Sequence, residues 1–188
     1  MAVAEVDVSV VVRCRDDEER IGHTISRLVE HLQSLGLRFE VLVADEGSGD
    51  NTVAVATLLR RQCKEIEVVH GEETNALFAA AQRAHGKTLI LLDARADAGL
   101  SPLGFVLGRV NDDLDLFVMS GRYVVLRRTR TWRAFDALHQ RDWPSVERRL
   151  VERARELGLR HSMVELRSQR RRLRDLLPLP SLKRSFAR

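Results

Sequence analysis

Continuous apolar runs alternate with amphipathic stretches along the first half of the chain. The runs are short and rich in valine, isoleucine and leucine, which is typical of strands buried on both faces of a sheet. They occupy residues 8–12, 39–44, 65–70 and 88–92. Between them, apolar residues recur at helical spacing over 21–35, where Gly36 marks the expected helix end. Further helices are predicted at 51–62, with Asp50 as its cap, and at 74–85.

The second half of the chain continues with elements of both kinds. The expected elements are a short helix up to residue 110, two strands that meet near residues 120–121, helices at 129–139 and 144–157, and a strand at 159–166. Strands that alternate with helices predict an α/β fold with a mostly parallel central sheet flanked by helices. We expect a single domain over residues 1–166, followed by a basic C-terminal segment, residues 167–188.

Acidic residues stand where two of the predicted strands end. Asp45 and Glu46 follow the second strand, and Asp93 follows the fourth. The carboxyl ends of parallel strands meet at one edge of the sheet, where ligands of open α/β sheets bind. The alternative is that Asp45 and Glu46 only fix the glycine-rich turn that follows them. The recurrence of the feature at Asp93 favours a ligand site.

The turn after the first predicted strand is crowded with charges. Its acids, residues 16–19, suit the first turn of a helix, where the helix dipole favours negative charge. Contact of Asp16 or Asp17 with a ligand is the alternative interpretation. Arg13 and Arg15 are expected to be solvated, with a phosphate contact as the alternative.

Four segments, taken in order, resemble the family-2 glycosyltransferases, which have the GT-A fold. SVVVRCRDDEERIG (9–22) resembles the family's first strand and Asn-Glu-Glu turn, and VLVADEGSGDNT (41–52) resembles its Val-Asp-Asp-Gly-Ser motif. LILLDAR (89–95) resembles the strand that leads into its Asp-x-Asp motif. WPSVERRLVERARELG (143–158) resembles its Trp-Gly-x-Glu-Asp segment and the following helix. The resemblance covers roughly residues 7–160 and implies a single GT-A-like domain.

The resemblance also implies roles for individual residues. Asp45, with Glu46 beside it, would contact the base of a nucleotide-sugar donor such as a UDP- or GDP-sugar, and Asp16 takes the asparagine place near the donor. Asp93 would hold a magnesium or manganese ion on the donor diphosphate. Glu147 would act as general base on the acceptor hydroxyl, in an inverting displacement. Glu147 reads equally well as a surface acid of a helix.

The Asp-x-Asp motif departs from the family pattern, because it reads Asp93-Ala94-Arg95. An arginine at the second position repels a divalent ion. Two hypotheses follow. In the first, the chain is an active transferase in which Arg95 contacts the diphosphate directly or Asp97 replaces the missing metal ligand. In the second, the chemistry is lost and the fold serves as a nucleotide-binding or protein-binding module.

Composition restricts the remaining function classes. The formal net charge is +4, and the basic residues concentrate in the second half and in the tail. A basic tail suits an anionic membrane surface or a protein partner, whereas nucleic-acid binding is not favoured because no aromatic residues interleave with the charges. Two cysteines, no apolar run of about 20 residues and no signal-like start predict a cytoplasmic protein. A peripheral position at the inner face of the membrane, held by the basic tail, is the alternative to a solvated tail. The excess of arginine over lysine suggests a GC-rich bacterial genome.

Overall fold

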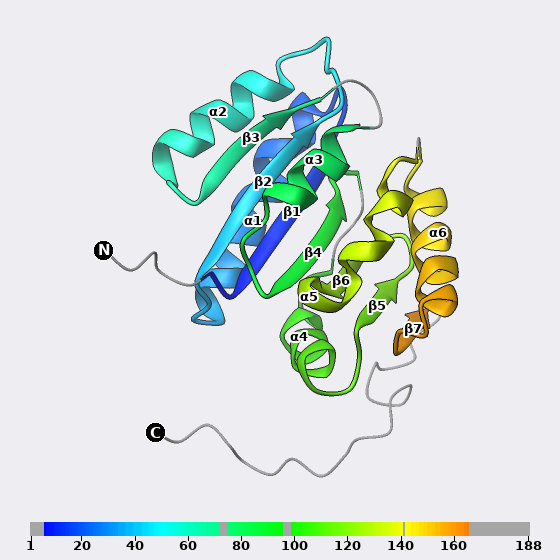
Figure 1. Ribbon diagram of the computed structural model, residues 1–188. Helices are drawn as coiled ribbons and strands as arrows, with labels where there is room; N and C mark the ends of the chain where they lie inside the picture. The colour runs from blue at the N-terminus through cyan, green and yellow to red at the C-terminus, as the bar shows by residue number, and fades with distance from the viewer. Residues whose placement is uncertain (1–5, 72–74, 96–98, 141, 166–188) are drawn as a thin grey trace.

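A seven-stranded sheet with the strand order β3-β2-β1-β4-β6-β5-β7 forms the centre of the molecule (Figure 1). The computed structural model describes residues 6–71, 75–95, 99–140 and 142–165. The predicted tail, residues 167–188, and the candidate ligand Asp97 lie outside these residues. No helix in the described ranges is long and apolar enough to cross a membrane.

The strands of the first half form a parallel block, as predicted. β1 (Val8–Cys14) lies between β2 (Phe39–Asp45) and β4 (Thr88–Asp93), and β3 (Ile66–His70) pairs with the outer side of β2. The second half adds β5 (Leu116–Met119), β6 (Tyr123–Arg127) and β7 (His161–Val164). β6 runs antiparallel to β4 and β5, and β7 runs parallel to β5. The sheet is therefore mostly parallel, which confirms the predicted fold class.

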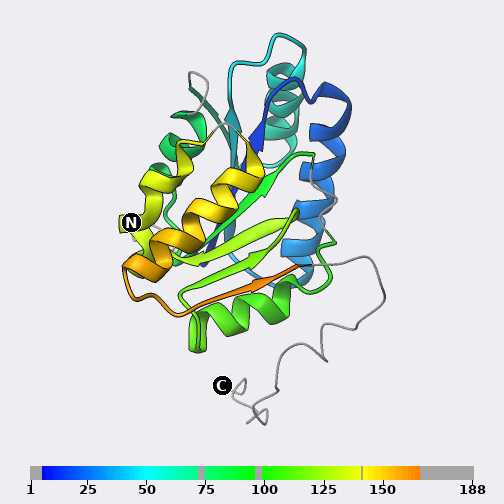
Figure 2. The same ribbon diagram turned by 90° about the vertical axis from the view of Figure 1, so that its right-hand side faces the viewer.

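Helices cover both faces of the sheet (Figure 2). One face carries α1 (Glu18–Ser34), α2 (Thr52–Gln62) and α4 (Leu103–Asp112). The other carries α3 (Asn75–Arg83), the 3-10 helix η1 (Trp132–Leu138) and α6 (Trp143–Glu156). In β1, Val10 and Val12 pack into the first core and Val11 into the second. Both faces of the strand are buried, which explains its continuous apolar run.

Two local details differ from the predictions. The helix expected at 129–139 is a short α5 (Arg128–Thr131) followed by the 3-10 helix η1. The residue at the N-cap position of α2 is Asn51 rather than the predicted Asp50. Asp50 nevertheless accepts a hydrogen bond from the backbone N–H of Thr52 at 2.9 Å. It therefore stabilises the start of α2 from one residue further out.

The register of the sheet brings the strand ends to a common level. Cys14 pairs with Asp45, and Arg13 pairs with Asp93. The turn between β5 and β6 reaches the same edge, because Tyr123 pairs with Leu92. The carboxyl edge of the sheet therefore carries the candidate residues that end or follow β1, β2 and β4.

Candidate functional site

A cavity of about 400 Å³ lies at this carboxyl edge. Its volume is within the range of about 300–1,000 Å³ that is usual for small-molecule sites. The walls come from the β1–α1 turn, the ends of β2 and β4, and the start of α6. The lining residues are Arg13, Cys14, Arg15, Asp16, Asp17, Glu46, Asp93, Arg95, Asp142 and Trp143. The structure thus brings together four of the predicted donor-site residues: Asp16, Glu46, Asp93 and Arg95.

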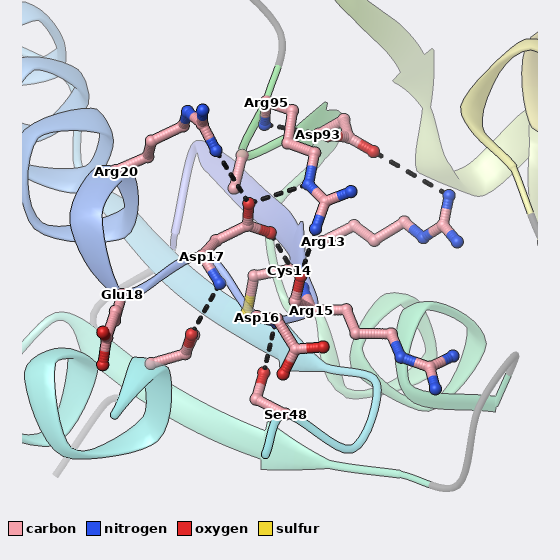
Figure 3. A network of polar contacts seen from close by, with 12 residues as sticks. Arg13, Cys14, Arg15, Asp16, Asp17, Glu18, Arg20, Ser48, Asp93 and Arg95 are labelled. Atoms are coloured by element: carbon pink, nitrogen blue, oxygen red, sulfur yellow. Dashed lines mark hydrogen bonds and ion pairs between the residues drawn. The ribbon is translucent and has the colours of Figure 1, made fainter. Parts of the chain in front are cut away.

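Hydrogen bonds join the β1–α1 turn to the glycine-rich turn after β2 (Figure 3). The backbone N–H of Asp16 donates to Ser48 Oγ at 3.0 Å, and Asp16 Oδ1 accepts from the Gly49 N–H at 2.7 Å. The backbone N–H of Asp17 donates to Thr52 Oγ1 at 2.8 Å. Asp16 has a φ of 51°, a left-handed conformation that aspartate tolerates better than most residues. These contacts fix the floor of the cavity without a ligand.

Arg13 and Glu46 form a buried ion pair in the cavity wall. Arg13 Nε and Nη2 both approach Glu46 Oε2, at 2.8 and 2.7 Å. Burial raises the pKa of Glu46, and Arg13 opposes that rise. Glu46 Oε1 is also buried and has no hydrogen-bond partner among the described residues. The expectation that Arg13 is solvated is wrong, because its guanidinium is buried and paired with Glu46 at the end of β2.

Asp93 lies between two arginines (Figure 3). Its Oδ2 is 3.8 Å from Arg13 Nη1, and its Oδ1 accepts a hydrogen bond from the backbone N–H of Arg95 at 2.8 Å. Burial raises the pKa of Asp93, while its hydrogen bond with the Arg95 backbone and the charge of Arg13 oppose the rise. Both carboxylate oxygens therefore already face a donor or a cation.

The guanidinium of Arg95 folds back onto the β1–α1 turn. Its Nε donates to Asp17 Oδ1 at 2.8 Å, and its Nη2 donates to the carbonyl oxygen of Arg15 at 2.5 Å. Asp17 Oδ2 in turn accepts from the Arg15 N–H at 2.9 Å. The contact with Asp17 raises the pKa of Arg95 above its ordinary value. Arg95 is thus a fixed positive charge at the cavity mouth.

Asp45 does not line the cavity. Its Oδ1 accepts from Ser48 Oγ at 2.5 Å, both of its oxygens lie within 3.4 Å of the Ser48 N–H, and His70 Nδ1 is 3.8 Å from Oδ2. Asp45 therefore fixes the turn after β2, and its neighbour Glu46 is the acid that faces the cavity.

Glu147 lies on α6, outside the cavity lining, and ties that helix to the β5–β6 turn. Its Oε2 accepts from Ser120 Oγ at 3.0 Å, and its Oε1 accepts from the Gly121 N–H at 2.8 Å. The residue is buried, so it is not the surface acid of the alternative interpretation. Burial raises the pKa of Glu147 above its ordinary value. One turn earlier on the same segment, Asp142 and Trp143 do line the cavity.

The described side chains do not fit a divalent metal ion. No group of three or more histidine, cysteine, aspartate or glutamate side chains in the described ranges could hold such an ion. Asp93, the expected ligand, faces Arg13 and the backbone of Arg95 instead.

The mostly parallel sheet and the polar cavity at its carboxyl edge define an α/β protein of the GT-A class. A family model described as "Glycosyl transferase family 2" matches residues 9–174, and the chain belongs to this family. Both the fold class and the family resemblance are confirmed.

Relatives and solved structures agree with this assignment. The glycosyltransferase AglD of Haloferax volcanii is 31% identical over 113 residues, which are 57% of this chain and 18% of AglD. The mannosyltransferase PcManGT of Pyrobaculum calidifontis, solved with GDP-Man and Mn²⁺, matches with a TM-score of 0.68 at 15% sequence identity. The match covers 87% of this chain and 56% of the PcManGT chain. Glucosyl-3-phosphoglycerate synthase of Mycobacterium tuberculosis, solved with Mn²⁺, UDP and glucosyl-3-phosphoglycerate, matches with a TM-score of 0.57 at 16% sequence identity. This match covers 92% of this chain and 75% of the synthase chain. The chain spans less than a third of the length of the curated relatives that it matches.

Sequence reasoning missed several lining residues. Asp142 and Trp143 were not among the predicted site residues, and ligand contacts of Arg13 and Asp17 were only alternative interpretations. The signal for Arg13 was available: a charged residue that directly follows a run buried on both faces needs a partner at the strand end. No comparable signal marks Asp142 or Trp143, since they reach the cavity only through the packing of α6.

Proposed function

We propose that the chain transfers a sugar from a nucleotide-diphosphate donor bound in the edge cavity to an acceptor hydroxyl. The observation that carries this proposal is the fixed guanidinium of Arg95, which Asp17 and the carbonyl oxygen of Arg15 hold at the cavity mouth. A preorganised guanidinium is suited to the diphosphate of such a donor and to the charge that develops on it as it leaves. UDP- and GDP-sugars are the donors to test first, because the structural neighbours were solved with GDP-Man or UDP.

The nucleoside would lie against the β1–α1 turn and the end of β2. Glu46 Oε1 is buried and has no hydrogen-bond partner among the described residues, and Asp16 also lines the cavity. Asp45 supports this side by fixing the turn on which Glu46 stands. We therefore assign the base and ribose to the Asp16, Asp45 and Glu46 side, and the diphosphate to the Asp93 and Arg95 side.

Glu147 is the proposed general base. In an inverting displacement, the acceptor oxygen bonds to the anomeric carbon and the bond from that carbon to the donor phosphate breaks. The electron pair leaves with the nucleotide, and the acceptor proton passes to Glu147. A carboxylate whose pKa is raised by burial suits this role. Because Glu147 lies outside the cavity lining, the acceptor hydroxyl must approach at the Ser120 and Gly121 turn.

The test is release of UDP or GDP from their sugar conjugates by the full chain, measured with a panel of acceptor hydroxyls. Glu147→Gln should lose turnover and keep nucleotide binding, whereas Glu152→Gln, at a partly exposed acid on the same helix, should change neither. Loss of nucleotide binding in Glu147→Gln would contradict the proposed base. Failure of the wild-type chain to bind any of these nucleotides would contradict the transferase function and favour a protein-binding module.

The basic tail is proposed to contact an anionic surface. Residues 167–188 lie outside the described residues, so the proposal depends on charge alone. Flotation of the full chain with anionic and with neutral vesicles tests it. Binding to the anionic vesicles alone would support a peripheral membrane role, and binding to neither would direct the search to a protein partner.

A further inference from the structure

Two arginines lie where the family resemblance expects a metal ion. The side chain of Arg13 reaches Asp93 from β1, and the backbone of Arg95 binds the other oxygen of the same carboxylate. An ion bound to Asp93 Oδ2 would stand beside the Arg13 guanidinium, because Arg13 Nη1 is 3.8 Å from that oxygen. Two positive charges around the same carboxylate oxygen repel each other in a partly buried site.

A buried acid holds each of these guanidinium groups in place. Glu46, whose side chain is 3% exposed, binds Nε and Nη2 of Arg13. The remaining nitrogen of that guanidinium, Arg13 Nη1, is directed toward Asp93. Asp17, whose side chain is 2% exposed, binds Nε of Arg95. The two anchors belong to different loops, which are themselves joined by hydrogen bonds. Both positive charges are therefore preorganised in the cavity.

We propose that Arg13 and Arg95 together form a two-guanidinium clamp for the donor diphosphate, so that donor binding by this chain needs no divalent metal. This inference rests on the proposed function and adds Arg13 as a residue that determines how the donor is bound. Guanidinium groups offer planar pairs of N–H donors that match phosphate oxygens, and they keep their charge at any physiological pH. The clamp thus supplies the positive charge that an ion would supply.

Both arginines line the cavity next to Asp93. Arg13 is one of the last residues of β1, and Arg95 follows the end of β4. A diphosphate between them would contact the Nη1 side of Arg13 and the exposed side chain of Arg95, which is 59% exposed. Asp93 then balances the two cations rather than binding an ion.

Calorimetric titration of the full chain with UDP and GDP, in EDTA and in excess Mn²⁺, is the first test. The clamp predicts equal affinity in both conditions. Binding that appears only with Mn²⁺ would overturn the clamp while leaving the transferase function intact, and it would direct attention to ligands such as Asp97. Absence of binding in both conditions would overturn the clamp and the proposed function together.

Variants of the two arginines complete the test. Arg95→Gln should weaken nucleotide binding in EDTA about tenfold or more, since it removes charge-assisted hydrogen bonds. Arg83→Gln is the matched control, because Arg83 is also exposed, at 58%, and is paired with an acid away from the cavity. Equal affinity of Arg95→Gln and Arg83→Gln would overturn the clamp.

The buried position of Arg13 requires a second pair of variants. Arg13→Gln leaves Glu46 without its partner, so the double variant Arg13→Gln with Glu46→Gln is measured beside it, and circular dichroism establishes that each is folded. Arg13→Lys keeps the charge without the planar fork. The clamp predicts weak binding in the folded double variant and partial recovery in Arg13→Lys. Wild-type affinity in the folded double variant would overturn the role of Arg13.

Discussion

Arg95 donates a hydrogen bond from Nε to Asp17 Oδ1 at 2.8 Å, across 78 positions of the sequence. This contact joins the end of β4 to the start of α1 and orients the guanidinium at the cavity mouth. Asp17 is buried, whereas the side chain of Arg95 is mostly exposed. In the proposed function, Asp17 is therefore a positioning residue that would act on the donor through Arg95.

Asp17→Asn is expected to weaken UDP or GDP binding about tenfold, because a charged acceptor for Arg95 becomes a neutral one and the guanidinium loses its fixed orientation. Titration calorimetry measures the change. Glu19→Gln, an exposed acid two residues further along, is the control and should bind nucleotide like the wild type. Unchanged affinity in Asp17→Asn would show that the orientation of Arg95 does not matter for binding.

Arg95→Asp restores the second acid of the Asp-x-Asp pattern. We expect this variant to bind nucleotide weakly in EDTA and more tightly when Mn²⁺ is added, because a carboxylate pair offers the hard oxygen ligands that such ions prefer. Arg95→Asn removes the charge without adding a carboxylate, so it should be weak in both conditions. If manganese leaves the affinity of Arg95→Asp unchanged, the region around Asp93 lacks the geometry for an ion.

The sequence was sufficient to predict the central sheet and the edge of the sheet at which the candidate site lies. Continuous apolar runs predict strands buried on both faces, and the acids after two of them mark the carboxyl edge. The three-residue pairing of Arg13, Glu46 and Asp93 could not be predicted in the same way. It depends on the register that sets Arg13 opposite Asp93 and on the turn that directs Glu46 inward.

The second half of the chain shows the same limit. Helical spacing predicts α6, but it does not tell which side of the helix meets the β5–β6 turn. Glu147 accepts hydrogen bonds from Ser120 and Gly121, which lie 27 and 26 positions earlier in the sequence. These bonds depend on how α6 packs against the β5–β6 turn. The change from α5 to the 3-10 helix η1 is likewise not indicated by the sequence, because residues 129–139 have ordinary helical spacing.

The ion pair of Arg13 and Glu46 is expected to contribute to stability because the two side chains are only 10% and 3% exposed. Glu46→Ala should lower the free energy of unfolding by about 3 kcal/mol, since it leaves a buried guanidinium without its main partner. Glu67→Ala, which removes the exposed partner of Arg83, should cost less than about 1 kcal/mol. Urea unfolding measures both. Equal losses in the two variants would mean that the wall of the cavity is solvated.

The raised pKa of Glu147 predicts a pH dependence of stability whose sign follows from proton binding. Above the ordinary value of 4.5 and below the raised value, the folded chain holds a proton on Glu147 that the unfolded chain has lost. The free energy of unfolding therefore falls as the pH rises through this window, and the stabilisation is fully present only below 4.5.

Glu147→Gln removes this titration and keeps acceptor and donor groups for Ser120 and Gly121. Measured by urea unfolding, the stability of the variant relative to the wild type should be higher at neutral pH than at pH 4.5, the ordinary pKa of glutamate. Glu152→Gln is the control on the same helix, and its difference from the wild type should not follow this trend. A stability difference between Glu147→Gln and the wild type that stays constant with pH would mean that Glu147 is ionised at no cost in the folded chain. Burial would then not raise the pKa of Glu147, and its proposed role as general base would depend on its position alone.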